Sequence, residues 1–590
     1  MSLDQRPSQP AEWPIHPSRG IGAPFGFVGR FMRGGFSGWT VASAVIACVV
    51  MMPLLALLVL GLGGSGDLWP HLMAYVLPEA IGTTLLLLVG VGLMVTTIGT
   101  LTAWLVTAYD FAGRRWLEWA LLLPLAMPTY IIAYSYLDLL HPIGPLQSGL
   151  RHLLGLSSPR DLLLPDIRSL GGCVLLFGFV LYPYVYIATR AMFHMQVASL
   201  VEVAHTLGAG RLGVFFRVAL PLARPAIAVG ASLALMEAVN DVGASEFLGV
   251  RTITLSIYTT WINRSNLGGA AQIALLMLLV IMVLVGVERY ARRHQRYVGN
   301  ARQGRRLSRQ NLSPLAGFMA FAACAMPVVA GFVLPVAYLV VEAVTRLRLF
   351  GLSDDIISQT LHSVGVAALA TVIALVLGLV LTFTVRQNSN PLTRLLQRLA
   401  SFGYAVPGTV LALGLLSPLA GLDHGLDALS LALLGHGSGL FLFASGGALV
   451  TAYVVRFLTM SVGGLETGFQ RIPPSLDQAG RTLGANPLGL LWRVHLPLIR
   501  PAVLSAGLLV FVDCMKELPA TLLLRPLNFE TLATHVYGEA SRGTYEDGSI
   551  AALAIVLFGL VPVMLIAGFG KNSQTMPQSA AKTDRTETGS

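Results

Sequence analysis

Residues Ser199–Pro225 read SLVEVAHTLGAGRLGVFFRVALPLARP, and residues Ser475–Pro501 read SLDQAGRTLGANPLGLLWRVHLPLIRP. The second stretch repeats the first at an offset of 276 residues, so that Gly208 aligns with Gly484. Self-similarity at a fixed offset is the sequence signature of a duplicated structure. The chain is therefore predicted to consist of two related halves.

Each copy predicts a short amphipathic helix at the surface. A capping box opens each one, Ser199-x-x-Glu202 in the first and Ser475-x-x-Gln478 in the second. Apolar or small residues then follow at helical spacing: Leu200, Val203, Ala204 and Leu207 in the first copy, and Leu476, Ala479, Gly480 and Leu483 in the second. A glycine ends each helix. The face is short and rich in small residues, which favours docking on a protein partner over the alternative of a helix lying on lipid.

The composition predicts a membrane protein. The chain has 590 residues, of which 55% are hydrophobic and only 12% are charged, and this combination excludes an ordinary soluble domain. Its net charge of +10 does not indicate nucleic-acid binding, because the basic residues lie mainly in short connections between apolar segments. We expect a lipid bilayer and no nucleic acid among its partners.

Apolar segments long enough to cross a bilayer recur along the chain. They lie near residues 37–62, 82–107, 116–138, 171–193, 224–247, 271–290, 316–342, 358–384, 398–419, 440–462, 501–525 and 549–570. The fold class is therefore an all-α polytopic membrane protein with about twelve transmembrane helices, arranged as two tandem six-helix halves.

The same segments suggest an orientation and domain boundaries. Six spans in each half place both termini, both repeated loops and the arginine-rich connector 289–309 on one side, which the arginine excess makes cytoplasmic. The expected units are a tail and first helix (1–80), a first transmembrane domain (81–290), a basic linker (291–314), a seventh helix and loop (315–356), a second transmembrane domain (357–570) and a disordered cytoplasmic tail (571–590). A weaker repeat, AMPTYIIAY at 126–134 and AVPGTVLAL at 405–413, supports the duplication.

The sequence offers no enzyme active site. Its three lysines, Lys516, Lys571 and Lys582, stand outside any Gly-Lys-[Ser/Thr] setting, so the chain has no P-loop for a nucleotide. If ATP drives this protein, a separate subunit hydrolyses it. We expect no cofactor bound by this chain, and the sequence assigns no metal ligands.

Ionisable residues gather in the span that follows each repeated loop. At the offset of 276 residues the aligned pairs are Glu237 with Asp513, Asn240 with Lys516, and Asp241 with Glu517. Such groups inside a membrane are costly and are usually paired or functional. Two interpretations stay open and are compatible: Lys516 neutralises Asp513 one helical turn away, or the acids line or gate a route for a cation.

The repeated loops resemble the EAA loop of ABC importer permeases. The matching residues are Glu202, Ala204, Gly208, Val218, Leu220 and Pro221 in the first copy, and Ala479, Gly484, Val494, Leu496 and Pro497 in the second. The second copy departs from the pattern with Gln478 in place of glutamate and Gly480 in place of alanine. The resemblance implies a type I ABC importer permease in the bacterial inner membrane whose loops dock on two ATPase subunits.

A second motif narrows the resemblance. DCMKELPATLLLRP at 513–526, followed by ETLATHVY at 530–537, is similar to the signature of the two-domain permeases for ferric iron. That family implies a periplasmic substrate-binding protein as a further partner and Fe³⁺ as the substrate. Permeases of the same class for thiamine, phosphonate or polyamine share the loop and remain alternatives.

Part of the sequence resembles a different class of protein, the ion-coupled secondary transporters. Asp110-x-x-Gly113-Arg114-Arg115 resembles the loop motif of the major facilitator family, but Val106 stands where that motif has glycine and the second half has no copy. A purely structural membrane scaffold would need no duplicated docking helices. Both readings explain less of the sequence than the importer permease does.

Overall fold

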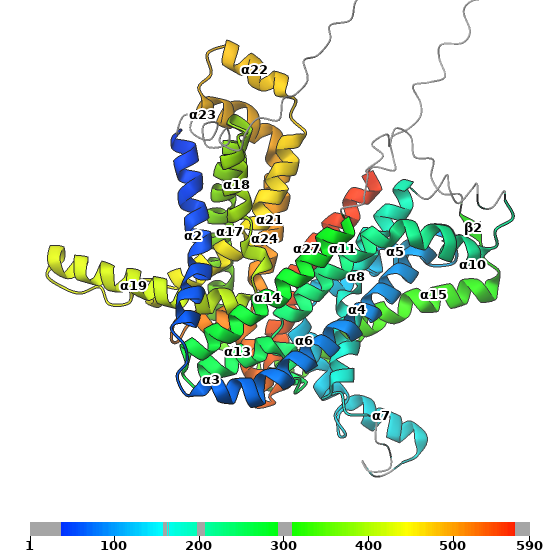
Figure 1. Ribbon diagram of the computed structural model, residues 1–590. Coiled ribbons are helices and arrows are strands. Elements are labelled where there is room, and N and C mark those ends of the chain that lie inside the picture. Colours follow the sequence, from blue (N-terminus) through cyan, green and yellow to red (C-terminus); the bar gives the residue numbers. More distant parts are fainter. Residues whose placement is uncertain are drawn as a thin grey trace, which may run out of the picture.

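The computed structural model describes residues 37–156, 158, 162, 165–196, 204, 207–292 and 309–572, and this part of the chain is almost entirely helical (Figure 1). The predictions for the N-terminal tail, for most of the basic linker and for the C-terminal tail from residue 573 lie outside the described residues. The remaining chain bears out the all-α class with two tandem halves.

The first half contains α2 (Gly38–Leu62), α3 (Leu68–His71), η1 (Leu72–Val76), α4 (Leu77–Ala108), β1 (Tyr109–Asp110), α5 (Arg114–Ala120), η2 (Leu123–Ala126), α6 (Thr129–Leu139), α7 (Pro145–Leu154), α8 (Leu170–Gln196), α10 (Arg211–Val214), η3 (Phe215–Ala219), α11 (Leu220–Asn240), α12 (Gly243–Phe247), α13 (Ile253–Ile262) and α14 (Leu267–Arg292).

The second half contains β2 (Gln310–Asn311), α15 (Pro314–Val328), η4 (Val329–Val333), α16 (Leu334–Phe350), α17 (Asp354–Gln387), α18 (Pro391–Ala400), η5 (Gly403–Ala405), α19 (Gly408–Leu434), α20 (Phe441–Ala444), α21 (Gly447–Gln470), α22 (Pro474–Thr482), α23 (Pro487–Leu490), η6 (Leu491–His495), α24 (Leu496–Met515), α25 (Pro519–Leu524), α26 (Leu532–Arg542) and α27 (Tyr545–Asn572). Strands β1 and β2 pair in parallel and tie the end of α4 to the start of the second half.

The number of spans agrees with the sequence. In the part of the chain that the structure describes, 11 helices are long and apolar enough to cross a membrane, and a bent pair would make a twelfth. That pair corresponds to the predicted span 116–138, which is bent by 94° between its two helices. The residue before Pro128, Met127, is extended (φ −102°, ψ 117°), because proline disfavours the helical conformation in the residue that precedes it.

Three further segments that were predicted as continuous transmembrane helices are interrupted in the structure. The segment 398–419 is interrupted in the same way as 116–138, with Val406 extended before Pro407, and its long helix begins only at Gly408. The segments 224–247 and 501–525 each break near their end, after Asn240 and after Met515. A fifth segment, 440–462, is shifted, since α21 runs from Gly447 to Gln470.

A Leu-Pro pair accompanies every π-helical turn in the described chain. The turns η1, η3, η4 and η6 are each followed directly by such a pair: Leu77-Pro78, Leu220-Pro221, Leu334-Pro335 and Leu496-Pro497. Proline has no N–H to donate, and its ring clashes with the carbonyl of the preceding turn. Widening that turn to π geometry removes the clash and lets the helix continue. The Leu-Pro of each repeated loop therefore shapes the helix that joins the loop to its span.

The first long helix of each half packs on the other half. Helix α2 lies against α17, α18 and α19 as well as α14, and α15 lies against α4 and α5 (Figure 1). A buried hydrogen bond of 2.9 Å from the hydroxyl of Ser43 to that of Thr384 fixes α2 on α17. Because each half supplies a helix to its neighbour, the two halves form one interlocked body.

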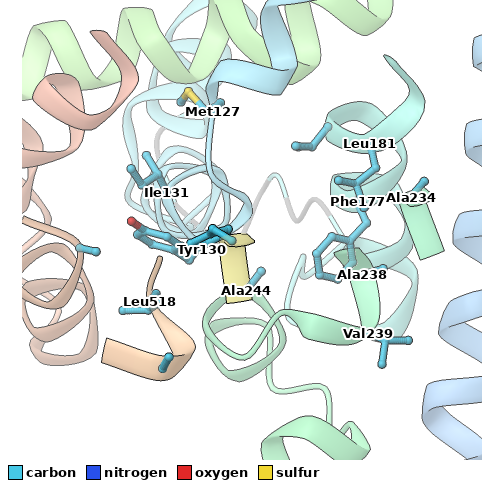
Figure 2. Packing of buried hydrophobic residues seen from close by; sticks show 14 of the residues in the cluster. Met127, Tyr130, Ile131, Phe177, Leu181, Ala234, Ala238, Val239, Ala244 and Leu518 are labelled. Carbon is cyan, nitrogen blue, oxygen red and sulfur yellow. The ribbon is translucent and has the colours of Figure 1, made fainter. Parts of the chain in front are cut away.

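The halves also meet at the end of α11. A Cβ on Gly243 would lie 2.8 Å from Cβ of Tyr130 and 2.9 Å from Cδ2 of Leu518, so only glycine lets these side chains approach. Figure 2 shows Tyr130, Ala244 and Leu518 together at this junction. Nearby, the hydroxyl of Tyr537 donates a 2.5 Å hydrogen bond to Glu246. Residues of both halves thus enclose the centre of the molecule.

The packing of α2 on α19 gives a stability prediction. A Cβ on Gly414 would lie 2.4 Å from the carbonyl oxygen of Pro53, whereas a Cβ on Gly421, farther along the same helix, meets nothing within 4 Å. We expect Gly414→Ala to destabilise the protein by about 1–3 kcal/mol through overpacking. Gly421→Ala should stabilise it by up to about 1 kcal/mol through helix propensity. Thermal unfolding of the full chain in detergent measures both, and equal shifts would show that α2 does not press on α19 as described.

Candidate functional site

A carboxylate caps the short helix that follows the break in each half. Asp241 accepts a 2.7 Å hydrogen bond from the N–H of Ala244 in α12, and Glu517 accepts one of 3.1 Å from the N–H of Ala520 in α25. The two acids are related by the offset of 276 residues, as are the two donors. The first N–H groups of a helix have no partner within it, so an acid here satisfies one of them. The breaks thus explain why acids stand in these apolar segments.

The two acids differ in their second partner. The hydroxyl of Thr129 donates to Asp241, whereas Nη1 of Arg456 lies 3.2 Å from Oε1 of Glu517. In the weaker repeat Gly408 takes the place of Thr129, and a Cβ there would lie 2.2 Å from Nη1 of Arg456. Glycine therefore makes room for the arginine. Asp241 in the first half therefore has a neutral donor as its second partner, whereas Glu517 in the second half has a cation.

The predicted pairing of Lys516 with Asp513 is present. Nζ of Lys516 lies 2.7 Å from Oδ1 of Asp513, and both side chains are mostly buried. Lys516 caps α24, so that the pair sits at the break rather than inside a continuous helix. Each acid of this cluster in the second half, Asp513 and Glu517, thus has its own cation.

All six candidate pathway residues line one cavity of about 260 Å³, and they come from both halves: Glu237, Asn240, Asp241, Asp513, Lys516 and Glu517. Thr129, Tyr130, Tyr184, Tyr404 and Arg456 line it too, together with apolar side chains. A charged cavity between two repeats of a membrane protein is the usual position of a transport site. Its wall carries four carboxylates and two cations.

Sequence reasoning missed Arg456 and the tyrosines of this wall. Arg456 is 5% exposed and lies inside an apolar helix, where an arginine is itself a signal of function or pairing. The tyrosines could not be identified from the sequence, because a tyrosine in an apolar segment is usually a packing residue. The side chains of Glu237 and Asn240 make no hydrogen bond or ion pair with any residue that the structure describes.

The second repeated loop forms the predicted surface helix, α22. It ends in a Schellman motif: Gly484 has φ +80°, its N–H donates to the carbonyl of Arg481, and the N–H of Ala485 donates to that of Gly480. In the first loop Gly208 has φ +79°, and the N–H of Ala209 donates to Ala204. The predicted role of both glycines is confirmed. Glu202 lies outside the described residues.

The predicted capping box of the second loop is wrong. Helix α22 begins at Pro474, its cap residue is Pro473, and no side chain bonds to its free N–H groups. Proline at the first position fixes φ near the helical value and starts the helix ahead of Ser475. Gln478 therefore lies within the helix and closes no box. The corresponding Ser199 and Glu202 lie where the structure gives no description.

Asp477 anchors α22 to the membrane helices. Oδ2 accepts a 2.7 Å hydrogen bond from Nε of Arg386 at the end of α17, and Oδ1 accepts one of 2.7 Å from Nε2 of His495. Partial burial raises the pKa of Asp477, but the hydrogen bonds and charge of Arg386 and His495 outweigh it and leave the pKa below its ordinary value. Sequence reasoning missed this link, because its members are far apart in the chain.

Both loops expose equivalent apolar side chains. Leu207 is 81% exposed and its partner Leu483 is 87% exposed, and the pairs Leu212 with Leu488 and Phe216 with Trp492 are exposed as well. Leu220 and Pro221, like Leu496 and Pro497, join each loop to its span. Repeated apolar surface of this kind indicates a binding face.

The fold and its cavity match a known family of membrane transport components. Residues 95–297 and 374–572, which together make up more than half of the chain, each match the model of the binding-protein-dependent transport system inner membrane component. The chain belongs to this family, whose members are the membrane permeases of ABC importers. ATP hydrolysis and substrate capture in such importers belong to separate subunits.

Three relatives illustrate the similarity. The chain is 25% identical to the Fe(3+)-transport system permease protein FbpB 2 of Haemophilus influenzae over 83% of this chain and 89% of that one. It is 26% identical to the probable ABC transporter permease protein y4fN of Sinorhizobium fredii over 82% and 86%. The molybdenum transport system permease protein ModB of Escherichia coli is 29% identical over a shorter alignment, which covers 34% of this chain and 86% of ModB.

The glycine at the end of each loop helix gives a coupling prediction. A Cβ on Gly484 meets nothing within 4 Å, so its cost is conformational. Gly484→Val should distort the loop at a cost of about 1–2 kcal/mol and weaken binding of the ATPase, while Gly484→Asn should retain binding, because asparagine tolerates positive φ. Gly208→Val should act likewise. Recovery of ATPase with the purified permease measures this, and undiminished recovery with both valine variants would contradict the assignment.

The cluster in the second half gives a prediction for abundance and uptake. Lys516→Met leaves Asp513 buried without its cation, which typically costs about 3–5 kcal/mol, so we expect less protein and less uptake. Combining Asp513→Asn with Lys516→Met removes both charges and should restore abundance. Quantitative immunoblots and uptake assays measure the two effects. A single Lys516→Met variant with normal abundance and uptake would place the lysine in a water-filled space instead.

Proposed function

We propose that this chain is the permease subunit of an ATP-binding cassette importer that carries ferric iron across the bacterial inner membrane. The observation that carries the proposal is the similarity to a permease named for Fe(3+) transport through both halves of the chain. The net charge of the cavity agrees with it, because four carboxylates face two cations there. A carboxylate-rich, oxygen-lined site suits a hard metal ion.

The proposed assembly has two ATPase subunits, one on each repeated loop, and a periplasmic substrate-binding protein on the opposite side. The equivalent exposed side chains of the two loops, such as Leu207 and Leu483, support one docking face per loop. In this arrangement the termini are cytoplasmic, ATP is used by the partner subunits, and this chain binds no cofactor of its own. Movement of the ATPases reaches the spans through α22 and its anchor at Asp477.

Other substrates of the same permease class fit less well. Molybdate is an oxyanion, and a cavity with an excess of acids repels oxyanions. Lys516 and Arg456 do not offset this, because each is already bound to a carboxylate. Cationic substrates such as thiamine or polyamines would also be attracted by the negative charge of the cavity. The relatives that match both halves of the chain, however, include a permease named for Fe(3+) transport.

The family membership argues against an ion-coupled secondary transporter. The residues that resemble the major facilitator motif also have a structural role. Arg114 is 5% exposed and lies 3.2 Å from both Asp110 and Glu118, and it donates to the carbonyl of Val106 at 3.3 Å. The segment therefore closes the end of α4 with buried polar contacts. This structural role accounts for the residues that resembled the major facilitator motif.

Reconstitution tests the proposed function. The permease, its ATPase and its binding protein are placed in proteoliposomes, and uptake of radioactive Fe³⁺ is followed with and without ATP. We expect uptake that requires ATP, both other subunits and iron-loaded binding protein. Uptake of molybdate in place of iron, or uptake that persists without the ATPase, would contradict the proposal.

A further inference from the structure

The charges of the cavity are distributed unequally between the two halves. In the second half Asp513 is paired with Lys516 and Glu517 with Arg456. In the first half the donors to Asp241 among the described residues are neutral, and they include the Thr129 hydroxyl and the Ala244 N–H. Glu237 has no hydrogen bond or ion pair within the described chain. The two acids of the cavity that form no ion pair in the described chain therefore lie at the end of α11 and at the break that follows it.

Their spacing places these carboxylates together. Glu237 and Asn240 are three residues apart near the end of α11 and share a face of that helix, and Asp241 follows directly as the first residue of the break. All three line the cavity. Together they supply two carboxylates and one amide oxygen, which are ligands for a hard cation.

A buried hydroxyl without a partner adds an independent sign that something binds here. Tyr130 is 3% exposed, lines the cavity, and its hydroxyl has no hydrogen-bond partner among the described residues. A buried polar group normally has one, because leaving it unsatisfied costs free energy. The hydroxyl lies within electrostatic range of both Asp241 and Glu517. A cation or its bound water in the cavity would satisfy it.

We propose that Glu237, Asn240 and Asp241 form a transit site for a hard multivalent metal cation. The site deepens the proposed function and rests on it for the direction of transport. A cavity of about 260 Å³ accommodates a metal ion with several waters, since one water needs about 10–15 Å³. The paired acids of the second half line the same cavity.

The site holds its cation weakly. No group of three or more metal-ligating acid, histidine or cysteine side chains occurs in the described part of the chain. Two carboxylates with water in the remaining positions give attraction without a closed cage. Transport requires this balance, because a site must attract the ion and still release it.

Luminescence of Tb³⁺ tests the inference on the purified full-length permease. Tb³⁺ is a hard trivalent cation whose emission is sensitised by nearby tyrosines, and Tyr130, Tyr184 and Tyr404 line the cavity. We expect Glu237→Gln to weaken Tb³⁺ binding by about tenfold or more, equivalent to about 1.4 kcal/mol. Glu237→Asp keeps the charge and should retain most of the binding.

One control separates local from general effects. Glu466→Gln removes an exposed carboxylate of α21 that does not line the cavity. This variant should not lower Tb³⁺ affinity. Because Glu237 makes no hydrogen bond or ion pair with a described residue, its Gln variant should keep the thermal stability of the parent protein, which the same samples report.

The outcomes distinguish the inference from the proposed function. Unchanged Tb³⁺ affinity in Glu237→Gln, or an equal loss in Glu466→Gln, would overturn the transit site, whatever the protein imports. Failure of the unsubstituted complex to take up Fe³⁺ would overturn the proposed function, and Tb³⁺ binding would then still decide the cation site.

Discussion

A carboxylate at the broken end of a membrane helix governs the centre of this protein. Asp241 and Glu517 each satisfy an N–H group of the short helix that follows, and without them the break would leave donors exposed in an apolar environment. Once an acid is fixed at this position, its charge is either neutralised by a cation of the protein or available to bind one from outside. The second half neutralises it with Arg456, for which Gly408 leaves the space. The first half offers only a hydroxyl. The cavity, its net charge and the inequality of the halves all follow from this difference.

The duplicated loops and the cavity are connected by helices with defined irregularities. Each loop joins its span through a π-helical turn in front of a Leu-Pro pair, and each span then breaks at the acid that lines the cavity. A displacement of the loop by a partner therefore acts on one continuous helix and ends at the break. Asp477, held by Arg386 and His495, adds a second connection in the second half that the first half cannot form in the same way, because Val201 and Ala219 occupy the equivalent positions. The two loops therefore expose similar surfaces, but the first lacks the aspartate and the histidine that attach the second.

Much of this architecture was predictable from the sequence, and the remainder was not for identifiable reasons. The repeat revealed two halves, helix-ending glycines and aligned acids, because these depend on local spacing. The pairing of Lys516 with Asp513 followed from one helical turn of separation. The bends before Pro128 and Pro407 and the breaks at Asp241 and Lys516 were missed, since apolar character continues through them. The partnership of Arg456 with Glu517 and the packing of α2 on the opposite half depend on tertiary contacts between distant segments, which periodicity does not encode.

The central claim is that both halves share one pathway through this cavity, which the ATPases move by way of the repeated loops. Its most direct test is the rate at which a membrane-impermeant maleimide modifies a cysteine placed at Asn240, measured from the outer side of vesicles that contain the complete complex. The unsubstituted chain, with its own four cysteines, gives the background. The account predicts a rate that changes when the ATPases are trapped with nucleotide. A cysteine that reacts equally in both states, or in neither, would contradict it.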